Sequence, residues 1–158
     1  MITIRRLQTG EVNLFKQLRL QALQEAPYAF PSTYEAALQR SAESWREQAE
    51  RTTHGPDRAT FIAFSDEVPI GMAAFYRDEA KVDVGELLQV WVSAAYRGTN
   101  VASDLMDAIF KWANQNNFHT IIAGVTKGNA RALKFYDKYG FSLMEETAEG
   151  VYLVKEIA

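Results

Sequence analysis

The amino-acid sequence predicts an α/β fold in which helices flank a mixed β-sheet. The first observation is the order of apolar patterns along the chain, which reads β-α-α-β-β-β-α-β-α-β-β. The second is a pair of strand patterns, VGELLQVWV and HTIIAGV, which a helical pattern joins into a parallel crossover. The third is composition: 158 residues that are 47% apolar can bury one core, so we expect a single domain over residues 1–158.

One strand and two helices are predicted in the N-terminal third of the chain. Apolar and polar residues alternate from Ile2 to Leu7, as in a short strand. Apolar residues recur at helical spacing from Leu14 to Ala22, and this helix ends before Pro27. The prolines and aromatics of APYAFPSTYEAAL indicate a shaped loop, and a second helix is predicted from about Tyr34 to Glu50.

A hairpin and a longer strand are predicted in the middle of the chain. Thr60 to Ser65 and Val68 to Arg77 have strand patterns, and Asp66-Glu67 forms the turn between them. Lys81 to Val92 is the longer strand. A helical stripe then runs from Val101 to Ala113.

The C-terminal part of the chain is predicted to hold three strands and one helix. His119 to Val125 is a strongly apolar strand. A helix follows from about Asn129 to Tyr139, and Gly140 is placed to end it with positive φ. Phe141 to Glu145 and Val151 to Glu156 are the final strands.

Composition and charge exclude several classes of function. A net charge of −3 does not favour nucleic acid as a partner. Without cysteine, the chain forms no disulfide, zinc–thiolate site or cysteine nucleophile. His54 and His119 lie far apart and no residues have the spacing of metal ligands, so we expect no metal. No signal peptide or membrane-spanning run is recognisable, so we expect a cytoplasmic protein without a membrane partner.

The segment YRGTNVASDLM has the features of a phosphate-binding turn that opens a helix. A helix N-terminus presents unpaired N–H groups and a partial positive charge, so an anion can bind there without a charged side chain. Gly98 and the small residues after it leave room for the anion, and Arg97 adds a cation. Asn100 stands where a glycine is expected, and asparagine tolerates left-handed geometry better than other non-glycine residues. An ordinary capped helix also explains this turn, so both readings stay open.

Two segments together resemble the signatures of the GNAT superfamily of acyl-CoA-dependent N-acetyltransferases. They are VWVSAAYRGTNVASDLM and NARALKFYDKYGF, and the resemblance extends to the strand order and is strongest from Glu86 to Phe141. It implies a mostly antiparallel central sheet flanked by helices, and acetyl-CoA as cosubstrate. The family's pyrophosphate turn would fall on six residues, with asparagine where glycine is usual: Arg97, Gly98, Thr99, Asn100, Val101 and Ala102.

Two side chains of the second signature are candidates for the site. The resemblance implies that Tyr136 is a general acid for the departing thiolate, because a phenol can donate a proton there. The alternative is a core aromatic beside Leu133 on the same helix. Asn129 is expected to cap this helix, and the resemblance adds contact with the cofactor.

Glu86 lies on the strand before the turn. Simple alternation would place Glu86, Leu88, Val90 and Val92 on one face, although a bulge in the strand would change that count. A carboxylate on an apolar strand face is costly to bury, so it is either a paired structural group or a functional base. The resemblance implies a base, and it implies that the backbone of Val90, Trp91 and Val92 binds the pantetheine arm and the thioester oxygen.

The acceptor is expected to bind between the loop around Phe30 to Tyr34 and the final hairpin. Phe30, Tyr34 and Trp45 either line that site or pack in the core and at its rim. Three carboxylates of the hairpin either attract a cationic amine or are simply solvated: Glu145, Glu146 and Glu149.

We therefore expect an N-acetyltransferase that moves an acetyl group from acetyl-CoA to a primary amine by direct attack. A second enzyme hypothesis uses another acyl group or an oxygen acceptor. The alternative from a different class is a catalytically silent acyl-CoA-binding module with a regulatory role, although the chain keeps both Glu86 and Tyr136. The identity of the amine and the formation of a homodimer stay open, since recognition lies in variable loops.

Overall fold

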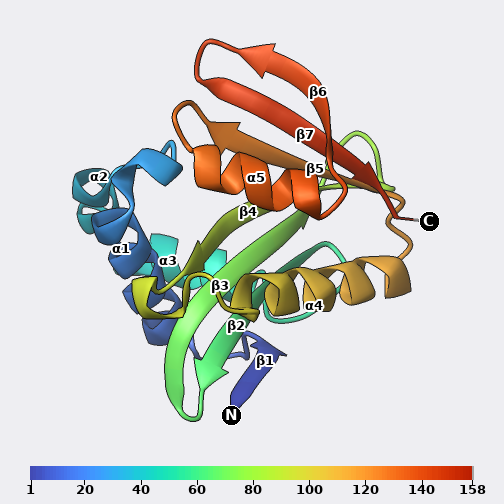
Figure 1. Ribbon diagram of the computed structural model, residues 1–158. Helices are drawn as coiled ribbons and strands as arrows, with labels where there is room; N and C mark the ends of the chain where they lie inside the picture. Colours follow the sequence, from blue (N-terminus) through green and yellow to red (C-terminus); the bar gives the residue numbers. More distant parts are fainter. Residues whose placement is uncertain (158) are drawn as a thin grey trace.

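Seven strands form one sheet through the centre of the molecule (Figure 1). In chain order they are β1 (Ile2–Arg6), β2 (Arg58–Ser65), β3 (Val68–Arg77), β4 (Val84–Val92), β5 (Thr120–Thr126), β6 (Ser142–Thr147) and β7 (Gly150–Glu156). The structure is a computed structural model, and it describes residues 1–157. The order across the sheet is β1-β2-β3-β4-β5-β7-β6, in which β4 and β5 are parallel and the other neighbours antiparallel. This confirms the predicted mixed, mostly antiparallel sheet.

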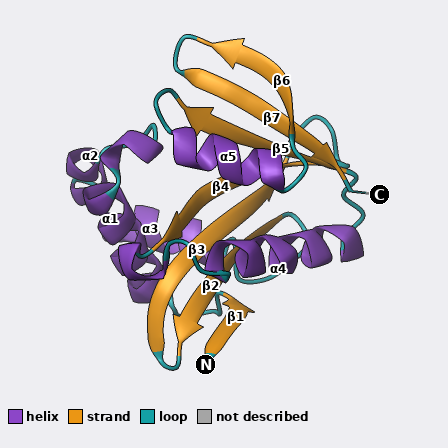
Figure 2. Cartoon of the chain, in the orientation of Figure 1, coloured by secondary structure: helices purple, strands orange, loops and turns teal. Residues whose placement is uncertain are grey.

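Helices cover both faces of this sheet (Figure 2). On one face gather α1 (Val12–Glu25), α2 (Tyr34–Leu38) and α3 (Ala42–Glu50). On the other face lie α4 (Val101–Gln115) and α5 (Ala130–Lys138). Two short 3₁₀ turns, Pro27–Ala29 and Ala94–Tyr96, follow α1 and β4.

The predicted helix from Tyr34 to Glu50 is wrong in one respect, because the chain breaks it into α2 and α3. Ser41 has extended backbone angles, and its hydroxyl accepts a hydrogen bond from the N–H of Ser44 at 3.1 Å. This cap starts a new helix, which a serine at an N-cap favours. The prediction for Gly140 is confirmed: it has φ +101° directly after α5.

Each face of the sheet has its own hydrophobic core, and strand alternation decides which residue joins which core. Ile62 and Met72 pack with side chains of α1 and α3, among them Trp45. Their chain neighbours Phe61 and Ala73 join the cluster under α4 and α5. Burial of a large apolar side chain typically stabilises the fold by about 1.5–3 kcal/mol. The two clusters therefore hold the sheet between its helical layers.

A β-bulge in β4 breaks the predicted alternation of that strand. Met72 of β3 pairs with Trp91 and Ala74 pairs with Leu88, so β4 has an extra residue in this interval. The bulge includes Gln89, which has φ +57°. Beyond it, the side chain of Trp91 joins the core on the α1–α3 face. The prediction that alternation continues from Glu86 through Val90 and Val92 is therefore wrong, because Val92 joins the opposite core.

The parallel pair β4–β5 ends early, and the two strands part. Partner residues run only from Val84 with Thr120 to Leu87 with Ala123. Beyond this point β4 continues to Val92 alongside β3, and β5 continues to Thr126 alongside β7. One edge of each strand is therefore left without a strand partner.

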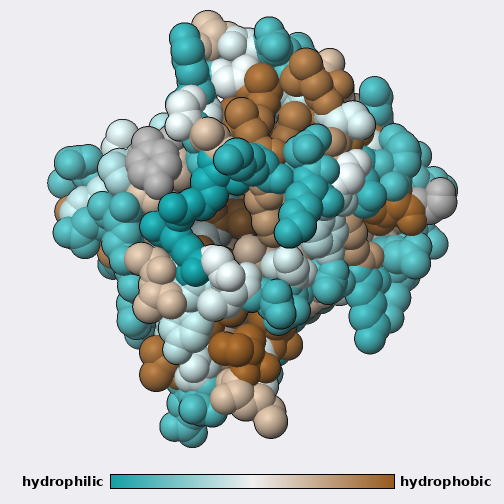
Figure 3. Space-filling view, in the orientation of Figure 1, coloured by the Kyte–Doolittle hydropathy of each residue, from teal (hydrophilic) through white to brown (hydrophobic). Residues whose placement is uncertain are grey.

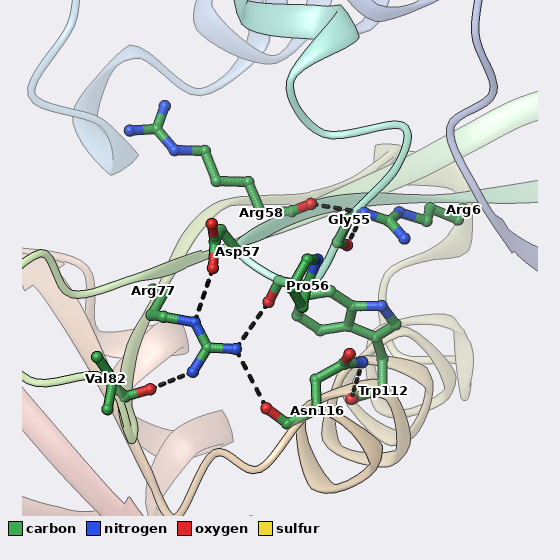
Figure 4. Close-up of polar contacts among 9 residues, drawn as sticks. All are labelled: Arg6, Gly55, Pro56, Asp57, Arg58, Arg77, Val82, Trp112 and Asn116. Carbon is green, nitrogen blue, oxygen red and sulfur yellow. Dashed lines mark hydrogen bonds and ion pairs between the residues drawn. The ribbon is translucent and has the colours of Figure 1, made fainter.

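Arg77, the last residue of β3, ties together segments that are far apart in the sequence (Figure 4). Its Nε donates to Asp57 Oδ1 at 3.0 Å, and its guanidinium carbon lies 3.8 Å from the ring centroid of Phe118. Its other nitrogens donate to the backbone oxygens of Pro56, Val82 and Asn116. The side chain thus joins the loop before β2, the turn before β4 and the end of α4.

Replacement of Arg77 by methionine is expected to destabilise the protein. The variant loses hydrogen bonds from a charged group whose side chain is only 16% exposed. We expect the free energy of unfolding to fall by about 3 kcal/mol, as judged from urea titration. The control is Arg46→Met, which removes an exposed i,i+3 ion pair and should cost less than about 0.5 kcal/mol. Equal effects of the two substitutions would contradict a structural role for Arg77.

Candidate functional site

A cavity of about 900 Å³ opens where β4 and β5 part. Its walls come from β4, from the turn at residues 96–100 with the start of α4, from the end of β5, from α5, and from the loop after α1. Figure 3 shows this face of the molecule hollowed near its centre, with apolar surface at the bottom of the recess and polar groups around it. The cavity is bounded by most of the residues that the sequence singles out.

The turn before α4 contains one residue in the left-handed region, and it is Gly98 with φ +81°. Asn100 has φ −85° and is the N-cap residue of α4, and its side chain makes no capping hydrogen bond. The prediction that Asn100 uses left-handed geometry in place of glycine is therefore wrong. An L-residue adopts the observed angles readily, so asparagine causes no strain here.

Backbone N–H groups at the start of α4 are available to a ligand. Ala102 and Ser103 lie in the first helical turn, where an N–H has no helical acceptor, and both line the cavity. The side chain of Val101 is 2% exposed and belongs to the core, so only its backbone is near the turn's surface. Arg97 lines the cavity as well, and its Nε donates to the oxygen of Val92 at 3.3 Å. This bond ties the turn to the end of β4.

Tyr136 lies on the cavity wall contributed by α5 and is 6% exposed. Its ring packs edge-on against Phe135 and Phe141, at centroid distances of 5.4 and 5.1 Å. Its hydroxyl makes no hydrogen bond to any residue in the range 1–157. Burial raises the pKa of this phenol well above its usual value, so the hydroxyl keeps its proton at neutral pH. The protonated hydroxyl is therefore available as a hydrogen-bond donor to a ligand in the cavity.

Glu86 lies on the cavity wall contributed by β4 and is half-buried. Its carboxylate has neither a hydrogen bond nor an ion pair with the part of the chain that the structure describes. Burial raises the pKa of Glu86, and the negative charge of Asp78 raises it further. A carboxylate with a raised pKa is a better proton acceptor than an exposed one.

Asn129 has the predicted capping geometry. Its side-chain oxygen accepts a hydrogen bond from the N–H of Ala132 at 3.2 Å, which caps α5. The same residue also lines the cavity, as do the predicted strand residues Val90, Trp91 and Val92. Capping therefore leaves Asn129 at the surface that a ligand would meet.

The three aromatic candidates for acceptor binding are separated by the structure. Phe30 lines the cavity, whereas Tyr34 is not part of the wall. Trp45 is 2% exposed and packs edge-on against Phe15 in the core. Of the hairpin carboxylates only Glu149 lines the cavity; Glu145 and Glu146 are exposed on β6.

Comparisons with known proteins assign the family. A model of the acetyltransferase (GNAT) family matches residues 20–141, which is most of the chain. The chain belongs to the GNAT acetyltransferase family. No curated protein matches the sequence.

Solved structures share this fold along the whole GNAT domain. An acetyltransferase of the GNAT family from Streptococcus pneumoniae is 19% identical, with a TM-score of 0.83 and 100% of both chains covered. The PaiA N-acetyltransferase from Thermoplasma acidophilum, solved with coenzyme A, is 17% identical, with a TM-score of 0.77 and 99% of both chains covered. YncA from Salmonella typhimurium, solved with its cofactor acetyl-CoA, is 15% identical, with a TM-score of 0.76 and 100% and 95% coverage.

Several cavity residues of this GNAT chain are missed by the sequence analysis. Gln89 gives no signal, because glutamine is not a residue type that marks a position of positive φ. Arg131 and Lys138 line the cavity from α5, and their place within the second signature segment is the signal that could have found them.

Across residues 1–157 no helix is long and apolar enough to span a membrane, and no three acidic or histidine side chains meet as a metal-ligand group.

The pH dependence of stability should reveal the raised pKa of Glu86. A group whose pKa is raised by folding stabilises the folded state at pH values below the pKa of the unfolded chain. That stabilisation is lost as the pH rises through the folded-state pKa. We therefore expect Glu86→Gln to raise the melting temperature at about pH 7 and to leave it unchanged at about pH 4. A variant that melts earlier than the wild type at neutral pH would indicate a structural partner for this carboxylate.

Proposed function

We propose that the protein is an N-acetyltransferase that transfers the acetyl group of acetyl-CoA to a primary amine. The observation that carries this proposal is the cavity between the parted strands. A buried, protonated phenol, Tyr136, lies on the wall contributed by α5, and a half-buried carboxylate, Glu86, lies on the wall contributed by β4. Acyl transfer to an amine needs one proton donor and one proton acceptor in such an arrangement.

The cofactor half of the cavity suits an anionic ligand with an extended arm. The first turn of α4 offers backbone N–H donors to a pyrophosphate, and Gly98 leaves space beside it. Three of the charged wall residues are cations: Arg97, Arg131 and Lys138. Beyond Leu87, β4 has no partner on its β5 side, so a pantetheine arm can pair with Val90 to Val92 as an added strand does. The solved complexes of PaiA and YncA show that this fold accommodates coenzyme A and acetyl-CoA in those proteins.

The proposed chemistry is a direct transfer. The neutral amine attacks the thioester carbonyl carbon, a C–N bond forms, and a backbone N–H of β4 stabilises the oxygen as it gains negative charge. The amine gives up a proton to Glu86, directly or through water. The C–S bond then breaks, and the departing thiolate takes the proton of Tyr136. No protein nucleophile takes part.

The decisive experiment measures thiol release from acetyl-CoA in the presence of a panel of primary amines. Release that depends on the amine supports the proposal, and mass spectrometry of the acetylated product shows which nitrogen reacts. Binding of acetyl-CoA without release with any amine would support the silent binding module instead. Preferential turnover of a longer acyl-CoA would be consistent with the proposed mechanism but would show that acetyl-CoA is not the preferred acyl donor.

Substitution of Gly98 tests the turn as the pyrophosphate site. Valine disfavours the φ of +81° at Gly98, and its side chain would extend into the open space that the turn leaves for a ligand. We expect coenzyme A affinity, measured by calorimetry, to fall at least about tenfold. Gly55→Val is the matched control: Gly55 has φ +79°, its added Cβ also meets no atom within 4 Å, and it lies outside the cavity. Equal affinity in the two variants would remove the turn from the binding site.

Substitution of Tyr136 tests the general acid. Tyr136→Phe keeps the packed ring and removes only the hydroxyl, so coenzyme A affinity and the melting temperature should change little. We expect kcat to fall at least about tenfold, at the lower end of the usual contribution of acid–base groups. Tyr139→Phe is the control, since Tyr139 is a second phenol on the cavity wall, at the C-cap of α5, but its hydroxyl donates to Asp107. That variant should lose about 1 kcal/mol of stability and keep its turnover. Wild-type turnover in Tyr136→Phe would mean that solvent supplies the proton.

A further inference from the structure

Arg19 of α1 is a buried charged side chain without a counter-ion. It is 7% exposed, and its Nη1 is shielded from solvent with no hydrogen-bond partner. No carboxylate of residues 1–157 forms an ion pair with it. Burial lowers the pKa of Arg19 to about 10, so the guanidinium still carries its charge at neutral pH. An uncompensated buried charge costs several kcal/mol. It is therefore unfavourable for Arg19 to remain buried without a counter-ion.

The surroundings of Arg19 are aromatic and cationic. Its guanidinium carbon lies 5.0 Å from the ring centroid of Phe30, which lines the cavity. Arg19 itself lies outside the cavity wall, so Phe30 is the residue that contacts the guanidinium and also lines the cavity. The charged groups that influence the pKa of Arg19 are Tyr76 and Arg40, and neither is a carboxylate. Arg40 donates to Ser44 and stacks on a core tryptophan, so it also lacks an ion pair.

A row of side chains connects this cationic region to the proposed base. Arg58 on β2, Tyr76 on β3 and Glu86 on β4 are direct partners across three strands. Partners in antiparallel strands share one face, with Cβ atoms about 4.5–5.5 Å apart. The guanidinium carbon of Arg58 lies 4.4 Å from the Tyr76 ring centroid, and Figure 4 shows this side chain pointing away from the Arg77 cluster. Gln48 of α3 donates to the Tyr76 hydroxyl at 3.3 Å, so the row faces the α1–α3 layer.

We propose that the amine acceptor also carries a carboxylate, and that Arg19 binds this carboxylate while the amine lies near Glu86. This inference rests on the proposed function and identifies the class of acceptor. A guanidinium binds a carboxylate through two parallel hydrogen bonds, and the carboxylate supplies the missing counter-ion. Phe30 belongs to the loop after α1, and the proposal requires its ring to move aside when the carboxylate binds. Free α-amino acids carry an amine and a carboxylate on the same carbon.

The test compares α-amino acids with their α-carboxamides as acceptors. The ratio of kcat/KM for the acid over the amide is measured in the wild type and in Arg19→Gln. Any difference in the basicity of the two amines cancels when the ratios are compared. We expect this ratio of kcat/KM values to fall at least about tenfold in Arg19→Gln, as for the loss of a charge-assisted pair. The fall should arise from a higher KM for the acid. Coenzyme A affinity should be unchanged, Arg19→Lys should recover part of the ratio, and Arg46→Gln should leave it as in the wild type.

A binding measurement keeps the inference testable if no amine is acetylated. N-acetyl-α-amino acids, added with coenzyme A, should raise the melting temperature of the wild type and leave that of Arg19→Gln unchanged. Without ligand, Arg19→Gln should melt at the wild-type temperature or above it, because it removes an unpaired buried charge. A lower melting temperature with an unchanged acid-to-amide ratio would overturn the inference and make Arg19 a packing residue. Absence of thiol release with any amine would instead overturn the proposed function.

Discussion

The parting of β4 from β5 is the constraint on which the candidate site depends. Parallel pairing stops after Leu87 and Ala123, yet β4 keeps β3 and β5 keeps β7 on their outer edges. Each strand is therefore anchored along its length while its inner edge stays open. Unpaired backbone groups in a sheet interior are normally costly, and a bound ligand that pairs with them removes that cost. The bulge at Gln89 adds a second effect, because it turns Trp91 toward the α1–α3 layer.

The charged side chains near this opening differ from those that hold the fold together. Arg77 fills its donors with three backbone oxygens and a carboxylate, and Arg6 donates to three backbone oxygens. Around the cavity, by contrast, Glu86 and Arg19 are half-buried or buried and have no partner of opposite charge. Desolvation without compensation destabilises these groups in the free protein. Groups destabilised in this way are typical of functional sites, where ligand binding relieves the cost.

Sequence patterns were sufficient for the order and type of the elements, apart from the break between α2 and α3, because alternation and helical spacing follow directly from backbone geometry. They also located the turn before α4 and the cap at Asn129, where local hydrogen bonding decides the conformation. The bulge at Gln89 could not be predicted, since it arises from the mismatch between β3 and β4 rather than from the residue's own preference. The same limit applies to Arg19: a helical arginine is usually solvated, and only the packed structure shows that this one is buried.

The two halves of the proposed site would recognise their ligands in different ways. This difference explains why family membership indicates the cofactor but not the acceptor. In the proposed mode of binding, the cofactor is held by backbone groups of α4 and β4, which any sequence compatible with the turn and the parted strands will present. The acceptor would instead be held by side chains from α1 and the loop after it, such as Arg19 and Phe30. Arg19 lies just outside residues 20–141, the segment that matches the family. On this proposal, acceptor choice depends on a region that the family's fold positions but whose side chains it does not specify. The unpaired charge of Arg19 is then the physical indication from which the acceptor's chemistry is inferred.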